Sequence, residues 1–181
     1  MGVHNIKKRE EQLVKTAFKA FKKIPEITIL ADNVEERLGC ISFYAKDIHY
    51  NLFVKLLSDR FGIQVRGGCA CAGTYGHYLL HVDYEYSKSI TDQIDHGDLS
   101  EKPGWVRLSL HPTNTDEELS FIMDAINQIV KNAGQWKNDY IYSPKTNEFY
   151  HKTFPDKNKK NYKKWFNLPR GGGALYADKP L

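Results

Sequence analysis

Two amphipathic segments, far apart in the chain, place the strongest constraint on how it folds. Residues 6–23 repeat apolar side chains at every third or fourth position, and Pro25 ends the repeat. Residues 115–131 carry a second apolar stripe, and the spacing of Thr115 and Glu118 at its start is typical of a capping box. Each stripe needs an apolar surface to cover it. We therefore expect two helices that pack against one common surface.

Short runs of β-branched and aromatic residues supply that surface. They predict four strands, the second of them central in the sheet, at residues 27–30, 38–44, 63–66 and 106–110. A third helix is predicted over residues 49–61, with Gly62 as its C-terminal stop. Residues 83–104 are acidic and polar and are expected to form an inserted loop. This order predicts an α+β fold: a two-layer sandwich with a mostly antiparallel sheet of about four strands and helices on one face.

The composition fits one soluble globular domain. Of the 181 residues, 41% are hydrophobic and 27% are charged, which excludes the disordered and fibrous classes. No apolar run reaches the roughly 18 residues of a membrane-spanning helix, and residues 1–23 lack the apolar stretch of a secretory signal. The three cysteines cannot form a disulfide framework. We expect a cytoplasmic protein with no membrane partner.

The basic charge is confined to the C-terminal segment. Residues 133–181 hold 10 basic and 4 acidic residues, a net charge of +6, together with 10 aromatic residues, whereas residues 1–132 have a net charge of −2. The segment is either an arm whose aromatic side chains pack on its own domain or on a partner, or a non-enzymatic binding module for nucleic acid or protein. Because it has no recognition motif, we do not expect nucleic acid as the partner. We divide the chain into a domain at 1–132 and a basic, aromatic-rich extension at 133–181.

The stretch Arg66-Gly67-Gly68-Cys69-Ala70-Cys71-Ala72-Gly73 is the strongest candidate for chemistry. Its glycines let the backbone approach a ligand, and a thiol beside an arginine tends to be nucleophilic. The same pattern fits a small buried cysteine in a glycine-rich turn, or part of a metal site that needs two further ligands. His77 and His81 share a face if this stretch is helical, but no third ligand follows at a clear spacing. Cys40, in the middle of an apolar strand, is expected to be buried and less reactive than Cys71.

Five segments occur in a characteristic order: Gly2 to Leu13, Ile24-Pro25-Glu26-Ile27, Arg37 to Phe43, Phe61 to Cys71, and Val106-Arg107-Leu108-Ser109-Leu110. The core pattern is Gly-Ile-x-Val-Arg-x-Gly-x-x-Cys, then a strand with Arg-x-Ser-Leu, then Asn-Thr before a helix. As an ordered set it resembles the C-terminal, small domain of class V aminotransferase-like pyridoxal-phosphate enzymes, the group of cysteine desulfurases and selenocysteine lyases. The resemblance covers about residues 2–132.

The resemblance implies roles for three residues. Cys71 falls where desulfurases keep the cysteine that attacks the substrate sulfur and becomes a persulfide. Arg107 falls where the family keeps the arginine that binds the substrate α-carboxylate, a task suited to a planar, two-pronged donor. Arg66 matches the loop arginine beside the active site. Without the resemblance, Arg107 reads as an ordinary edge-strand arginine with a surface acid as its partner.

The resemblance also implies a cofactor, pyridoxal phosphate, a small amino-acid substrate and a homodimer when the enzyme is intact. The family binds the cofactor through a lysine in a Ser-x-His-Lys setting, which no lysine of this chain has. We therefore expect a separated domain that lacks its N-terminal pyridoxal-phosphate-binding domain and neither binds the cofactor nor catalyses alone. Two further departures from the family are Cys69, a second thiol on the loop, and the 35 residues between Cys71 and Arg107.

Overall fold

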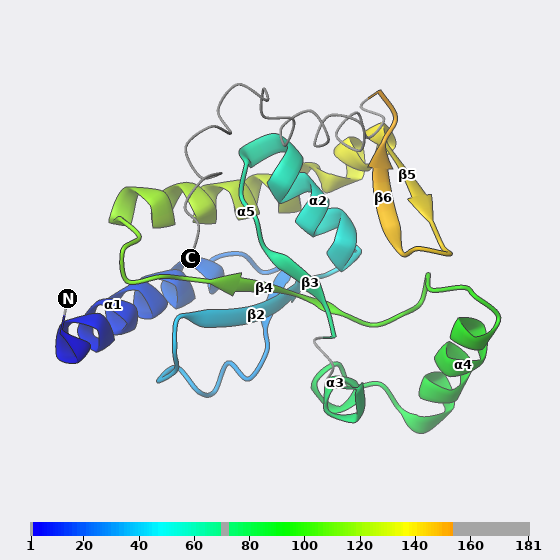
Figure 1. Ribbon diagram of the computed structural model, residues 1–181, viewed down its shortest axis with the longest axis horizontal. Coiled ribbons are helices and arrows are strands. Elements are labelled where there is room, and N and C mark those ends of the chain that lie inside the picture. The colour runs from blue at the N-terminus through cyan, green and yellow to red at the C-terminus, as the bar shows by residue number, and fades with distance from the viewer. Residues whose placement is uncertain (1, 70–72, 154–181) are drawn as a thin grey trace, which may run out of the picture.

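The computed structural model describes residues 2–69 and 73–153 (Figure 1). The elements in chain order are α1 (Val3–Phe21), β1 (Ile27–Ile29), β2 (Cys40–Ala45), α2 (Tyr50–Phe61), β3 (Arg66–Gly68), α3 (Gly73–Leu79), α4 (Tyr84–Asp95), β4 (Trp105–Ser109), α5 (Asp116–Trp136), the 3-10 helix η1 (Lys137–Asp139), β5 (Tyr140–Ser143) and β6 (Glu148–His151). None of the helices in these two stretches is long and apolar enough to cross a membrane.

Four strands form one antiparallel sheet in the order β1-β2-β4-β3. In the pairing of β2 with β4, Ile41 lies opposite Leu108 and Phe43 lies opposite Val106. Opposite residues of antiparallel strands share a face, so these four buried side chains lie on the same side of the sheet. The predicted α+β class, the four-stranded sheet and the interior position of the second strand are confirmed.

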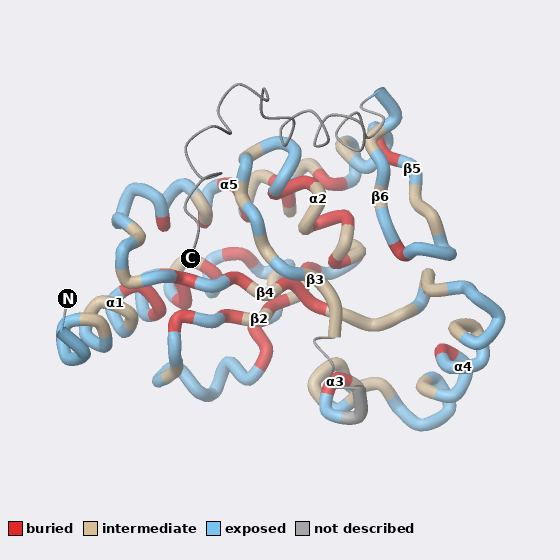
Figure 2. The backbone as a smooth tube through the Cα atoms, viewed as in Figure 1, coloured by how far each residue is buried: buried red, intermediate tan, exposed pale blue. Residues whose placement is uncertain are grey.

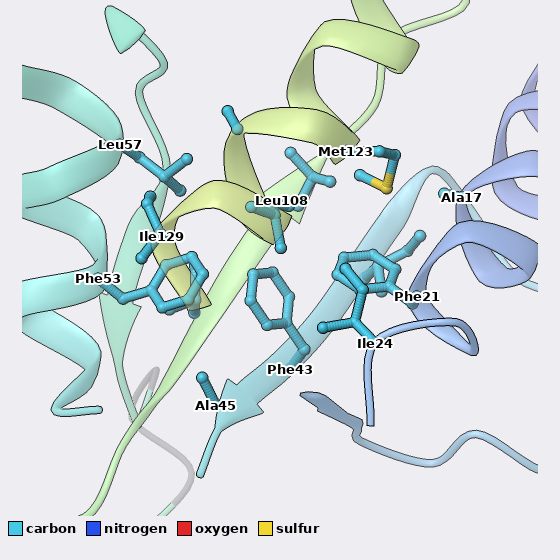
Figure 3. Close-up of a cluster of buried hydrophobic side chains, with 14 of the residues drawn as sticks. Ala17, Phe21, Ile24, Phe43, Ala45, Phe53, Leu57, Leu108, Met123 and Ile129 are labelled. Carbon is cyan, nitrogen blue, oxygen red and sulfur yellow. The ribbon is translucent and has the colours of Figure 1, made fainter. Parts of the chain in front are cut away.

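Helices α1, α2 and α5 cover this buried face. The ring centroid of Phe43 lies 4.9 Å from that of Phe21 in α1 and 5.5 Å from that of Phe53 in α2 (Figure 3). Ile129 of α5 belongs to the same cluster. Figure 2 shows the buried segments gathered where β2 and β4 meet these helices. The two amphipathic helices expected from the sequence therefore do share one surface.

Cys40 is exposed, so its predicted burial is wrong. It is the first residue of β2 and lies on the same face as Ser42 and Tyr44, because alternate residues of a strand point to the same side. The three helices cover the opposite face, that of Ile41 and Phe43. The apolar neighbours of Cys40 in sequence are therefore not its neighbours in the core.

Residues 83–104 contain a helix where a loop was expected. Helix α4 begins after Asp83, whose carboxylate accepts the backbone N–H of Tyr86 at 2.8 Å. Ile90 is the residue that α4 buries. Because so little of this helix is apolar, the periodic pattern that marks the other helices is too weak to predict it.

Helix α5 continues to Trp136, beyond its predicted end at residue 131. Ala133 is buried, and the Trp136 ring lies 6.1 Å from that of Phe61 between centroids, so apolar contacts stabilise the helix past its expected stop. Strands β5 and β6 then form a hairpin that packs on α2. The sequence analysis did not predict this hairpin. The division of the chain near residue 132 stays a prediction.

Strand β3 occupies Arg66–Gly68 rather than residues 63–66, and its two glycines pair with β4 instead of forming a turn. Gly67 packs closely on α2: a Cβ at this position would lie 2.9 Å from Asn51 Oδ1 and 3.1 Å from Tyr50 Cδ2. Only a residue without a side chain allows the strand to lie this close to the helix.

Candidate functional site

Three polar side chains form a row across the middle of the sheet, on the face that α1, α2 and α5 leave uncovered. Ser42 of β2 lies opposite Arg107 of β4, and Arg107 lies opposite Arg66 of β3. These residues alternate with core residues along their strands, so their side chains point away from the core. The structure thus brings the two predicted arginines together and adds Ser42, which the sequence analysis missed. Strand alternation combined with the pairing of β2 and β4 is the signal that finds it.

Arg107 is half-buried, and its Nε atom is buried without a hydrogen-bond partner among the described residues. Within the same part of the chain no carboxylate forms an ion pair with it. Its strand, β4, is interior, so the interpretation of Arg107 as an edge-strand arginine with a surface acid partner is wrong. A buried donor without a partner costs about 1–3 kcal/mol. A guanidinium in this state is suited to a carboxylate ligand, which it binds through two parallel hydrogen bonds.

Strand β3 leads from Arg66 into residues 69–72, called here the thiol loop because they include Cys69 and Cys71. Arg66 is exposed and places its charge beside that of Arg107, which makes this part of the face electropositive. Cys69, the residue after β3, is a half-buried free thiol. A negatively charged ligand at Arg107 would therefore lie near a thiol-bearing loop.

Two predicted features fall outside the described residues. Cys71, the expected nucleophile, lies in the segment 70–72, and its role stays a prediction. The same holds for residues 154–181, which contain most of the basic, aromatic-rich extension considered above as a binding module.

Helix α3 covers one end of the arginine-bearing face. Trp105 alternates with Arg107 along β4, so its ring lies on this face, yet it is only 5% exposed. A Cβ on Gly76 of α3 would lie 3.3 Å from Trp105 Cζ3 and 3.8 Å from Cys69 Cβ. In Figure 1, α3 and α4 lie below the strands, whereas α2 and α5 lie above them. Helix α3 therefore packs against Trp105 and Cys69 on the arginine-bearing side of the sheet.

The described residues contain no group of three or more His, Cys, Asp or Glu side chains that could hold a metal ion. Helix α3 ends at Leu79 and His81 has a positive φ of 55°, so His77 and His81 do not share a helical face. The Nδ1 atom of His77 instead lies 3.0 Å from the hydroxyl of Ser87 in α4.

The described residues do not fit the pyridoxal phosphate that the resemblance implies. A lysine that forms a Schiff base is held partly desolvated in its site, and none of the lysines in residues 2–69 and 73–153 is buried. The groups that the site does gather are two arginines, a serine hydroxyl and a thiol. Arginines and a hydroxyl can bind an anion such as a carboxylate, but none of these groups forms a Schiff base.

Comparisons with known proteins agree with the resemblance. The family model for aminotransferase class-V matches residues 1–122. No curated protein matches the chain. Among solved structures, the apo cysteine desulfurase from Thermococcus onnurineus NA1 is similar with a TM-score of 0.50 and 22% identity, over 72% of this chain and 27% of that chain. An Escherichia coli cysteine desulfurase with an S-sulfonic acid gives a TM-score of 0.46 and 16% identity over the same shares.

The likeness to the Thermococcus enzyme supports the α+β fold, and this chain spans only 27% of that enzyme's length. The family match covers most of the chain, from the N-terminal segment through β4 and into α5, and includes Arg66, Cys71 and Arg107. The chain therefore belongs to the class V aminotransferase family.

Proposed function

We propose that this chain is the substrate-binding C-terminal part of a pyridoxal-phosphate-dependent cysteine desulfurase or a closely related class V aminotransferase. In this proposal Arg107 binds the substrate α-carboxylate, Arg66 assists at the edge of the same site, and Cys71 accepts sulfur. The observation that carries it is the Nε atom of Arg107, which is buried without a hydrogen-bond partner among the described residues, with Arg66 on the adjacent strand. A carboxylate at this position supplies the acceptor that the described residues lack.

A small amino acid fits the spacing of the site. Strands β3 and β4 are neighbours in the sheet, and neighbouring strands lie about 4.8 Å apart. The thiol loop, which follows β3 directly, therefore begins close to a carboxylate bound at Arg107. In a substrate such as cysteine, the sulfur is only a few bonds from the carboxylate. In this proposal such a substrate reaches Arg107 with its carboxylate and the thiol loop with its sulfur.

In the proposed reaction the Cys71 thiolate attacks the substrate sulfur. A sulfur–sulfur bond forms, the substrate carbon–sulfur bond breaks, and its electron pair stays with the substrate carbon, which then takes up a proton. Cys71 becomes a persulfide. Pyridoxal phosphate, when bound, supplies the electron sink for such a substrate. In this proposal Arg66, five residues before Cys71 in the sequence, supplies a positive charge that favours the thiolate form.

The cofactor site is assigned to a part of the enzyme outside this chain. The short coverage of the Thermococcus enzyme and the absence of a buried lysine among the described residues support this assignment. By the family resemblance, the intact enzyme is a homodimer whose N-terminal domain binds pyridoxal phosphate; the proposed cytoplasmic location follows from the composition.

Sulfide release by the intact enzyme tests the role of Arg107. Cysteine is compared with cysteamine, which has the same thiol and amine but no carboxylate. Arg107→Lys keeps the charge and loses the two-pronged geometry, so we expect kcat/KM for cysteine to fall about 100-fold and that for cysteamine to change less than about threefold. Arg60→Lys is the matched control, since Arg60 pairs with Asp139 at 2.7 Å on the helical side of the sheet.

Two results would contradict the proposal. An equal loss of activity on both substrates in Arg107→Lys would mean that Arg107 does not act through the carboxylate. Unchanged sulfide release by Cys71→Ser would mean that Cys71 is not the sulfur acceptor.

A further inference from the structure

A buried side-chain amide ties the β5–β6 hairpin, which lies beyond the family match, to the start of α2. Asn147, in the turn of the hairpin, is 6% exposed. Its Nδ2 donates to the Tyr50 hydroxyl at 2.6 Å, and its Oδ1 accepts from the Tyr142 hydroxyl at 3.0 Å. Its backbone carbonyl accepts a hydrogen bond from the Asn51 side chain. A buried amide with these bonds made holds the hairpin in one position on α2.

The Tyr50 ring lies close to β3 and to the residue before β4, the two strands that carry the arginines. A Cβ on Gly67 would lie 3.1 Å from Tyr50 Cδ2, and a Cβ on Gly104 would lie 2.6 Å from Tyr50 Cε1. Gly67 follows Arg66 in β3, and Gly104 directly precedes β4. The ring thus fills the space where the two strands come closest to α2. Neither backbone can shift toward the helix without displacing it.

Tyr50 also lies within electrostatic range of the thiol loop. Burial raises the pKa of Tyr50, the hydrogen bond from Asn147 lowers it, and the charge of a Cys69 thiolate raises it. A displaced Tyr50 therefore affects Cys69 through the packing of Gly67, two residues before it.

We propose that Asn147 and Tyr50 are positioning residues that set the placement of Cys69, at the end of β3, relative to the arginine-bearing strand β4. This inference rests on the proposed function, because β4 carries Arg107, which that proposal assigns to the substrate carboxylate. The hairpin amide orients Tyr50 through its hydroxyl, and the Tyr50 ring sets the position of the backbone at Gly67 and Gly104.

A matched control is available at another contact of the hairpin with α2. The Tyr140 hydroxyl donates to Asp59 Oδ2 at 3.0 Å. This bond also joins the hairpin to α2, but Asp59 lies near the C-terminal end of the helix, and Tyr140 is not among the nearest contacts of Gly67 or Gly104. Tyr140→Phe therefore removes a hairpin–helix hydrogen bond and leaves the Tyr50 contact in place.

The experiment uses the 181-residue chain as wild type, Tyr50→Phe, Asn147→Gly and Tyr140→Phe. Tyr50→Phe keeps the ring, and Asn147→Gly suits the positive φ of 56° at this turn position. Cys69 is alkylated with iodoacetamide from about pH 6 to 9, and peptide mapping gives its rate relative to the exposed Cys40. Hydrogen exchange is followed at Gly68 and Trp105, which pair across β3 and β4.

We expect Tyr50→Phe and Asn147→Gly each to change the Cys69 rate about threefold or more and to speed exchange at both amides. Tyr140→Phe should stay within about 1.5-fold of wild type. A similar change in Tyr140→Phe would show that the loop responds to hairpin stability in general and would overturn the proposal. So would unchanged rates in the first two variants.

If circular dichroism shows that Asn147→Gly does not fold, Tyr50→Phe decides the question, because it alters one oxygen atom. None of these measurements uses turnover. A negative result for Arg107 in the sulfide-release test therefore does not contradict the positioning role of Asn147 and Tyr50. A negative result in the alkylation test likewise does not contradict the role of Arg107.

Discussion

Single residues of β2 have different roles because the strand separates two unlike faces of the sheet. Phe43 packs between Phe21 and Phe53 in the core. Ser42, the residue before it, lies opposite Arg107 on the other face. Alternation along one strand thus places residues that stabilise the fold beside residues that border the candidate site.

Two substitutions in β2 measure this difference. Phe43→Ala should lower the free energy of unfolding by about 3–5 kcal/mol, since it leaves a cavity in a closely packed core. Cys40→Ser should change it by less than about 0.5 kcal/mol, because the thiol is exposed. Urea unfolding of both variants gives the comparison. A loss in Cys40→Ser as large as that in Phe43→Ala would show that Cys40 belongs to the core.

The two faces of β2 can be told apart from the sequence when the two-residue repeat of a strand is applied to each residue in turn. Ile41 and Phe43 alternate with Cys40 and Ser42, so the pattern itself assigns Cys40 to the non-core face. The burial predicted for Cys40 came from counting apolar neighbours instead. The contact of Arg107 with Ser42 and Arg66 could not be predicted in this way, because it depends on the register between strands that are distant in the chain.

At the level of elements, the start of α2 depends on a histidine that acts as a cap. The Nδ1 atom of His49 accepts the backbone N–H of Asn51 at 3.1 Å, and the ring stacks on Tyr50 with centroids 4.6 Å apart. Burial lowers the pKa of His49 from its ordinary 6.5, and the charge of Glu101 opposes this shift. A protonated Nδ1 cannot accept the capping hydrogen bond, so folding favours the neutral ring.

This lowered pKa predicts a loss of stability in mild acid. The unfolded chain takes up the His49 proton at higher pH than the folded chain, so the contribution of His49 is complete above pH 6.5 and is lost as the pH falls through 6.5 toward the folded pKa. His49→Asn keeps an acceptor at the cap and removes the titration. We expect a weaker dependence of the free energy of unfolding on pH in this variant between about pH 7.5 and 5.5. If the free energy of unfolding, measured with urea, depends equally on pH in the wild type and in His49→Asn, the lowered pKa does not belong to His49.

Elements with a strong apolar period were predicted well, and elements that depend on distant partners were not. The capping box of α5 and the stripes of α1, α2 and α5 are local features, and the structure has them. Helix α4 buries a single residue, and the β5–β6 hairpin depends on contacts with α2 such as the bond between Asn147 and Tyr50. Local propensity does not include such contacts, so neither element stood out in the sequence.

For the molecule as a whole, the sheet divides the structure into a helix-covered core and a face that bears the arginines. Helix α3 reaches this second face at the Trp105 end, while Arg66 remains exposed. The Nε atom of Arg107, which has no hydrogen-bond partner in residues 2–69 and 73–153, lies on the same face. Under the proposed function, this surface is one side of an active site that a further part of the enzyme completes.

The chain alone should therefore form no specific covalent adduct with pyridoxal phosphate. A single lysine becomes selective for an aldehyde when its environment desolvates it and positions a phosphate beside it. The lysines in the described residues are exposed or half-exposed, and Lys55, one of the least exposed, lies 3.2 Å from the Asp59 carboxylate. After incubation with the cofactor and reduction with borohydride, peptide mapping should find label spread at low yield over several lysines, as in the urea-unfolded chain. Stoichiometric label on one lysine would show that this chain holds a complete cofactor site, and the assignment of that site to another part of the enzyme would then be wrong.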